Sequence, residues 1–428
     1  MRGIIPRLAL VAACCVAAIQ TPHAQDDASA AAVASARRIL ELLKQEKFED
    51  VAKDFTPQMT AAMSVKQLGD LWSSLHGRVG TLTSIIDGSV TSAGGITGVT
   101  LGCQFERAAL NVRVAFNSSG KIAGLGFVPR SAATVAPSVP PPSSGFVEEA
   151  VVVGGGEWAL PGTLSLPPGA GLPAVALVHG SGPADRDETV GANKPFRDLA
   201  WGLANRGVAV VRYEKRSLQH GAKMALNKNV TVQDETIDDA VLAAKLLREH
   251  ARIDRRRVFV LGHSLGATLA PRIAAQDREV AGLVILAGAT RPFDDVAKEQ
   301  IAYLSSLTPG GSAANEDAAF RQLKDGAPPS YWADLDAYHP AQVAATLTIP
   351  MLVLQGERDY QVTLRDLDGW RQALAGRAGV VIKAYPTLNH LFLAGEGKSV
   401  PTEYARPGTI PDFVLDDIAN WIKQESVK

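Results

Sequence analysis

VFVLGHSLGATLA, residues 258–270, decides the fold because it turns from strand into helix within a few residues. Residues 258–261 are all apolar, as in a strand buried on both faces of a sheet, and apolar residues return at helical spacing after the turn. Ser264 lies between two glycines at that turn. This setting predicts a nucleophile whose hydroxyl is exposed on a strained backbone at a helix N-terminus. The alternative is a glycine-rich turn with an idle serine.

The residues that flank Ser264 predict the surroundings of such a nucleophile. Gly262 and Gly266 remove side chains where the helix and a neighbouring strand must approach closely. Leu265 begins the helix, so its backbone N–H is available to stabilise an oxyanion formed beside the serine.

A second N–H donor is expected from HGSG, residues 179–182, which follows the apolar stretch AVALV. Ser181 is the first choice for this donor and Gly182 is the alternative. His179 is predicted to shape the loop. The opposite interpretation is a flexible glycine-rich loop without a role in chemistry.

A serine nucleophile needs a base, and only His339 and His390 follow Ser264 in the sequence. His390 lies in YPTLNHLF, in a loop after a buried strand at the sheet edge where Ser264 also lies, and is the predicted base. A structural loop histidine is the alternative. His339 lies in an insertion and is predicted to be a surface or cap residue. His263, beside the serine, is predicted to point away from it and to pack.

The base needs a carboxylate on its other ring nitrogen. Asp359 follows the apolar stretch MLVLQG, residues 351–356, and is the predicted acid. Glu357 is the alternative carboxylate. Asp359 has a structural alternative too, as a helix cap or a member of an ion pair.

The chain as a whole predicts two domains. Residues 148–428 alternate short apolar strands with helices, which predicts an α/β fold with a doubly wound, mostly parallel sheet. An insertion at about residues 291–345 is rich in aromatic residues and predicts a helical cap. Residues 28–130 predict a small α+β domain of helices and a strand meander. Residues 131–147 contain TVAPSVPPPSSG and predict a Pro/Ser-rich linker.

Several motifs together carry a family resemblance. HGSGPADRDE, VVRYEKR, GHSLG, QGERD and LNH resemble the α/β-hydrolase superfamily, in the branch of exported bacterial esterases related to dienelactone hydrolases and acyl-thioester hydrolases. Residues 28–130 resemble the small cone-shaped domain found ahead of such esterases. The resemblance implies that Ser264, Asp359 and His390 form a triad. Dienelactone hydrolases proper use a cysteine nucleophile, and the serine here favours ordinary esters.

These observations predict a serine carboxylesterase that hydrolyses small or medium acyl esters through an acyl-enzyme. The alternatives are a serine peptidase or acyl-thioesterase on the same fold, or a non-catalytic binding module. The net charge of −1 favours neither nucleic acid nor an anionic membrane as a partner. No metal-ligand spacing or phosphate loop is evident, so no cofactor is implied. The oligomeric state is left open.

The first 24 residues predict export. Arg2 and Arg7 precede the apolar run LALVAACCVAAI and a polar segment, which is the pattern of a secretory signal, and the run is too short to span a bilayer. The predicted location is the periplasm or the medium. A lipoprotein anchored at Cys14 is the minor alternative. After cleavage Cys103 is the only cysteine, so the mature chain forms no internal disulfide and Cys103 is predicted to be a buried strand residue.

Cleavage after Ala24 is expected to leave a mature chain that starts near Gln25. N-terminal sequencing of protein recovered from the cell envelope or the medium measures this start. A cytoplasmic protein that begins at Met1 would contradict the prediction, and a lipid-modified Cys14 would establish the anchored alternative.

Overall fold

The computed structural model describes residues 22–93, 96–106, 109–129, 140, 144–307 and 313–425. The chain divides into two compact units, Met1–Ala133 and Thr134–Lys428. Residues 1–21 of the predicted signal, including Cys14, lie outside the described residues. The predicted linker also lies outside them, apart from Pro140 and residues 144–147.

The N-terminal unit has an α+β fold. Its elements are α1 (Pro22–Lys44), α2 (Phe48–Ala52), α3 (Pro57–Ala62), α4 (Val65–Val79), β1 (Leu82–Ala93), β2 (Ile96–Phe105), β3 (Ala109–Phe116) and β4 (Ile122–Pro129). The strands form an antiparallel sheet in the order β1-β2-β3-β4. Leu40 of α1 and Trp72 of α4 share one core with Cys103, which is fully buried in β2 as expected. The predicted α+β class is confirmed.

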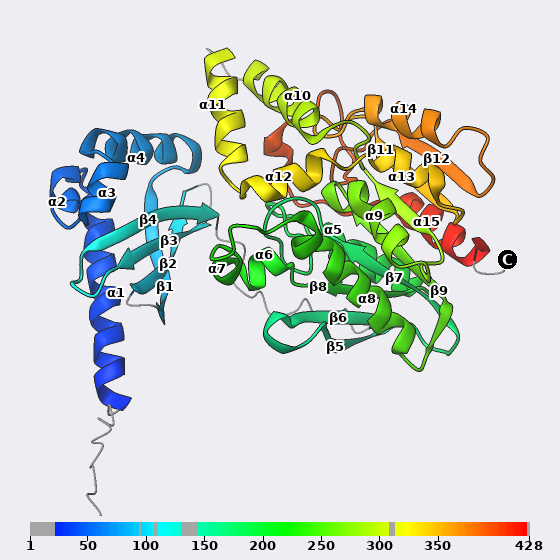
Figure 1. The fold of residues 1–428 in the computed structure, drawn as a ribbon, viewed down its shortest axis with the longest axis horizontal. Helices are drawn as coiled ribbons and strands as arrows, with labels where there is room; N and C mark the ends of the chain where they lie inside the picture. Colours follow the sequence, from blue (N-terminus) through cyan, green and yellow to red (C-terminus); the bar gives the residue numbers. More distant parts are fainter. Residues whose placement is uncertain are drawn as a thin grey trace, which may run out of the picture. The chain divides into compact units, whose positions relative to one another are not determined.

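The C-terminal unit is built on one eight-stranded sheet (Figure 1). Its strands are β5 (Val147–Val153), β6 (Leu160–Leu166), β7 (Leu172–Val178), β8 (Ala209–Tyr213), β9 (Ile253–His263), β10 (Leu283–Leu286), β11 (Met351–Gly356) and β12 (Val380–Tyr385). They lie in the order β12-β11-β10-β9-β7-β8-β6-β5. The strands from β12 to β8 in this order are parallel neighbours, whereas β6 pairs antiparallel with both β8 and β5.

The helices of this unit lie on both faces of the sheet and in the long connection after β10. They are α5 (Pro195–Asn205), α6 (Arg216–Gln219), α7 (Gly221–Met224), α8 (Asp238–Glu249), α9 (Leu265–Gln276), α10 (Phe293–Ser306), α11 (Ala313–Lys324), α12 (Pro329–Asp336), α13 (Pro340–Thr346), α14 (Leu364–Ala373) and α15 (Asp412–Glu425), with a π-helical turn at Gln233–Ile237 and 3₁₀ turns at Gly156–Trp158 and Pro401–Ala405. Helices α10 to α13 follow β10 and precede β11, where the sequence predicts the cap.

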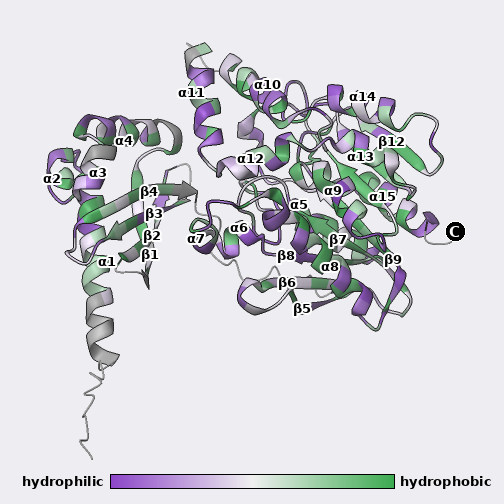
Figure 2. Ribbon diagram, in the orientation of Figure 1, coloured by the Kyte–Doolittle hydropathy of each residue, from purple (hydrophilic) through white to green (hydrophobic). Residues whose placement is uncertain are grey.

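Burial on both faces explains why the strands read as continuous apolar stretches. In β10, Val284 and Leu286 pack in the core that holds side chains of α5 and α15. Leu283 and Ile285 point the other way, into the core shared with α9 and α14. Figure 2 shows the apolar strands at the centre of this unit and hydrophilic residues on the helices around them. The predicted doubly wound, mostly parallel α/β class is therefore confirmed.

Removal of the N-terminal unit is expected to spare catalysis, because all the predicted site residues belong to the C-terminal unit. A variant that begins at Phe146 should keep its turnover number on a small soluble ester within about tenfold, a change of about 1.4 kcal/mol in the barrier. Circular dichroism would establish that the variant is folded. A folded variant with a thousandfold loss would mean that the N-terminal unit completes the site.

Candidate active site

The turn between β9 and α9 holds Ser264 in a conformation that L-residues rarely adopt. Its φ is 54° and its ψ is −116°, and its N–H donates to Leu286 O at 2.9 Å. A Cβ atom on Gly262 would lie 2.2 Å from Gly266 O, and one on Gly266 would lie 2.2 Å from Val178 O. Both positions therefore need glycine for α9 to approach the sheet this closely.

Left-handed backbone recurs around this turn. Among the described non-glycine residues, φ is positive at Glu46, Glu188, Ser264, Ala287 and Phe392. Apart from Glu46, each follows a parallel strand, so these residues lie in loops at the carboxyl edge of the sheet. Such conformations cost about 1–3 kcal/mol each and persist where the surrounding contacts enforce them. This edge is also where open α/β sheets bind ligands.

Asp359 and His390 are brought together in neighbouring loops. Asp359 Oδ2 lies 2.6 Å from His390 Nδ1, and both residues are buried. Asp359 Oδ1 accepts the N–H groups of Gln361 and Val362 at 2.7 and 3.0 Å, and Oδ2 also accepts from Gln355 Nε2 at 3.1 Å. The carboxylate is thus fixed in orientation. Glu357, the alternative acid, has an exposed side chain.

Asn389 organises the loop that carries His390. Its Oδ1 accepts the N–H groups of Leu391 and Leu393, each at 3.1 Å, and its Nδ2 donates to Glu403 Oε2 at 3.1 Å. In the sequence, Asn389 stands out only as part of the motif LNH. Its place directly before the predicted base is the signal that identifies it.

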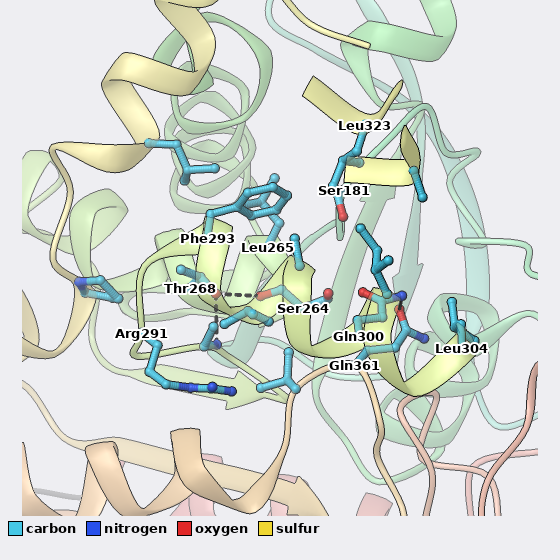
Figure 3. A pocket seen from close by; sticks show the side chains of 18 of the residues that line it. Ser181, Ser264, Leu265, Thr268, Arg291, Phe293, Gln300, Leu304, Leu323 and Gln361 are labelled. Atoms are coloured by element: carbon cyan, nitrogen blue, oxygen red, sulfur yellow. Dashed lines mark hydrogen bonds between the residues drawn. The ribbon is translucent and has the colours of Figure 1, made fainter. Parts of the chain in front are cut away.

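The predicted oxyanion donors lie at one cavity with the serine. Leu265 begins α9, where a backbone N–H has no partner within the helix. Ser181, Ser264 and Leu265 all line the cavity, and Figure 3 shows them around it. Gly182 is not among the lining residues and has a φ of 83°. Of the two predicted candidates for the second donor, Ser181 is the one that lines the cavity.

The cavity, of about 440 Å³, is mostly apolar, and the cap helices α10 to α13 supply many of its lining residues. Among the described residues that line it, Arg291 is the only cation, and it is bound by Asp366 at 2.7 Å and also pairs with Glu299. The other lining residues are Thr268, Ala289, Phe293, Val296, Ala297, Gln300, Ile301, Leu304, Ala319, Gln322, Leu323, Leu335, Tyr338, Pro340, Gln361 and Val362. The cavity therefore presents apolar groups and neutral amides to a ligand.

Among the aromatic residues of the predicted cap, Phe293 and Tyr338 line this cavity. Tyr303 stacks on Tyr360 with ring centroids 5.0 Å apart, and Tyr331 donates to Glu235 Oε2 at 2.8 Å. Trp332 Nε1 donates to Lys324 O at 2.7 Å. Tyr303 and Tyr331 therefore bind the cap to the rest of the unit, and Trp332 packs within the cap.

The remaining histidines have distinct surroundings. His179 Nε2 lies 3.0 Å from Asp185 O within its own loop, and burial lowers the pKa of His179 to about 4, so it shapes the loop as a neutral ring. His339 is exposed at the start of α13. His263 does more than pack, because its ring nitrogens contact Glu188 and the carbonyl of His390. That finding extends the prediction made from its position.

No group of three or more His, Cys, Asp or Glu residues in the described part of the chain is arranged to hold a metal ion. No described helix is both long enough and apolar enough to cross a bilayer.

Comparisons with known proteins agree with this architecture. Residues 36–125 match a family described as a protein of unknown function (DUF3887), and residues 197–407 match the prolyl oligopeptidase family. Esterase EstD of Thermotoga maritima is 39% identical over 397 residues, which cover 89% of this chain and 92% of the relative. The fold and the strained serine turn define an α/β-hydrolase. Within that class, the chain belongs to the family of serine ester hydrolases that includes EstD.

Solved esterase structures are similar at a greater distance. The Pyrococcus furiosus esterase Pf2001 is 15% identical with a TM-score of 0.45, covering 66% of this chain and 92% of that one. An esterase from Pyrobaculum calidifontis is 20% identical with a TM-score of 0.44, covering 66% and 87%.

Gly266→Ala is expected to destabilise the fold, because its methyl group would collide with backbone atoms of Val178 and His179 that cannot rotate away. Overpacking typically costs about 1–3 kcal/mol, and the rigid contact places this variant at the upper end. Urea unfolding measures the loss. Gly221→Ala is the control, since a Cβ atom there meets nothing within 4 Å. Equal stabilities for the two variants would contradict the close approach of α9.

Proposed function

We propose that this protein is a serine carboxylesterase in which Ser264 is the nucleophile, His390 the general base and Asp359 the acid that orients the base. The observation that carries the proposal is the 2.6 Å contact between Asp359 and His390 at the sheet edge that also presents the strained Ser264. Because Nδ1 faces the carboxylate, Nδ1 holds its hydrogen and Nε2 is left with the lone pair.

The reaction follows from these roles. His390 Nε2 takes the proton from Ser264 Oγ as that oxygen attacks the ester carbonyl. The backbone N–H groups of Leu265 and Ser181 stabilise the oxyanion. Collapse of this intermediate breaks the bond to the alcohol, which leaves with the proton from His390. A water molecule, deprotonated by the same histidine, then attacks the acyl-enzyme. The acid is released as the bond to Ser264 Oγ breaks and this oxygen takes the proton back from His390.

The cavity supports small or medium, uncharged acyl groups as substrates. A volume of about 440 Å³ lies toward the lower end of small-molecule sites, which span about 300–1,000 Å³. Arg291 is paired with two carboxylates, so it offers no unpaired charge to a negatively charged acyl chain. Apolar lining from α10 and α12 favours aliphatic or aromatic carbon.

A serine peptidase on the same fold is the second candidate, because residues 197–407 match the prolyl oligopeptidase family. Amide hydrolysis needs the same nucleophile and base, so only the preferred substrate distinguishes a peptidase from an esterase here.

We also propose that the protein acts outside the cytoplasm, on the basis of the charged and apolar succession in residues 1–24.

Ser264→Ala and His390→Ala are each expected to lower kcat by several orders of magnitude, and the double variant by little more, because the two groups act as a unit. Asp359→Asn should cost less, since the serine and histidine remain. His339→Ala is the control and should be nearly silent, as this residue is exposed. Initial rates on nitrophenyl esters, a peptide amide and a coenzyme A thioester measure both activity and substrate class.

A fluorophosphonate probe followed by mass spectrometry identifies the nucleophile directly. An adduct on a residue other than Ser264, or substantial activity in Ser264→Ala, would refute the assignment. Faster turnover of the peptide amide than of every ester would favour the peptidase.

A further inference from the structure

A buried carboxylate outside the proposed triad touches the loops that build the site. Glu188 lies in the loop after β7, is 5% exposed and has a φ of 49°. Its Oε1 accepts the N–H of Gly180 at 2.7 Å. Its Oε2 lies 2.9 Å from His263 Nδ1, a close contact of opposite charges when His263 is protonated, although the two atoms are not aligned as a hydrogen bond. Neither atom has a hydrogen-bond partner among the described residues, so this contact is what compensates their burial.

His263 extends this contact to the loop of the base. Its Nε2 lies 2.9 Å from His390 O, and the rings of His263 and His390 are 4.8 Å apart between centroids. Gly180 precedes Ser181, and His263 precedes Ser264. This buried pair thus contacts Gly180 of the oxyanion loop and the backbone carbonyl of His390, and it includes His263, the residue directly before the proposed nucleophile.

The surroundings of His263 favour its protonated form. The carboxylate of Glu188 and the carbonyl of His390 are both acceptors, and only an imidazolium has two N–H donors to offer them. Burial opposes the charge, yet Glu188 outweighs that penalty and raises the pKa of His263 above its ordinary value. Burial likewise opposes the charge on Glu188, and the His263 cation holds the pKa of that carboxyl below its ordinary value. The two residues form an ion pair.

Gly180 is held from its other side as well. Lys215, which is 2% exposed, donates from Nζ to Gly180 O at 2.7 Å. A Cβ atom on Gly180 would lie 3.2 Å from Ser264 Cβ, so this residue adjoins the nucleophile. The peptide groups before Ser181 are therefore fixed by two buried, charged side chains.

We propose that Glu188 is a positioning residue which, through Gly180 and His263, fixes the oxyanion loop, the nucleophile turn and the base loop relative to one another. The inference rests on the proposed esterase function. Misplacing reacting groups by about 1 Å costs about 10²-fold in rate, and losing an oxyanion donor costs about 10²–10³-fold. Because the substrate cavity is lined by other residues, the loss is expected in kcat rather than in KM.

Three substitutions of Glu188 distinguish the effect of its hydrogen-bonding position on kcat from the effect of its charge. Glu188→Ala removes both contacts and should lower kcat about 100-fold with KM within about threefold. Glu188→Gln keeps the length: its amide oxygen can accept from Gly180 and its amide nitrogen can donate to a neutral His263, so kcat should stay within about fivefold. Glu188→Asp keeps the charge but is one methylene shorter, so it cannot reach both partners and should lose at least about tenfold in kcat.

The control is Asp187→Asn in the same loop. Asp187 is equally buried but pairs with Arg212 and with Lys194, which lies 3.0 Å away, so its loss weakens the loop without touching Gly180. This variant should unfold at lower temperature and keep kcat within about threefold. Comparable losses of kcat in Asp187→Asn and Glu188→Asp would mean that loop stability alone matters, which would overturn the proposal.

The kinetic measurements use full-length protein, with kcat and KM on one nitrophenyl ester and a melting curve for each variant. Retention of kcat in both Glu188→Ala and Glu188→Asp would overturn the proposal, and so would a large loss in Glu188→Gln alongside an active Glu188→Asp. These two conservative variants test the positioning role even if Glu188→Ala fails to fold.

Fluorophosphonate labelling of the wild type is run in parallel. Absence of an adduct on Ser264 would refute the proposed function, whereas labelled wild type with fully active variants would refute only the positioning role.

Discussion

The site depends on how closely helix α9 approaches the strands beside it. Gly262 and Gly266 permit backbone contacts that any Cβ atom would prevent, and this close approach forces the chain to reverse within the single residue Ser264. The same reversal sets the N–H of Leu265 at a helix start, where no backbone acceptor competes for it. The strained serine and the position of the proposed oxyanion donor thus follow from one packing constraint.

Much of this arrangement could be predicted from the sequence because its signals are local. Continuous apolar stretches indicate strands buried on both faces, and the glycine pair indicates the turn at Ser264. The order of the residues along the chain and their place in loops after apolar strands predict Asp359 and His390, which the structure places in contact. Glu188 and Lys215 could not be found in this way. Their partners lie on other loops. Strand periodicity predicts on which face of the sheet a side chain lies, but it does not predict which polar group that side chain will contact.

The buried charged side chains around the site are each paired with a group of opposite charge. Arg291 is paired with Asp366 and Glu299, Lys215 lies 3.4 Å from Glu235, and His263 meets Glu188. A free cation in the cavity would bind the carboxylate product of ester hydrolysis and slow its release. Compensated charges avoid this, and they leave the backbone N–H groups to stabilise negative charge where it develops.

Backbone strain and stability are balanced within the same loops. Glu188, Ser264, Ala287 and Phe392 each hold a left-handed conformation, so the carboxyl edge of the sheet carries several unfavourable backbone states at once. These states persist because the strands beneath are buried on both faces and because Asn389, Glu188 and Lys215 bind the loop backbones directly. Substituting one of these anchors leaves the strands intact and releases the strain locally. Its effect therefore falls first on the geometry of the site and only secondarily on the fold.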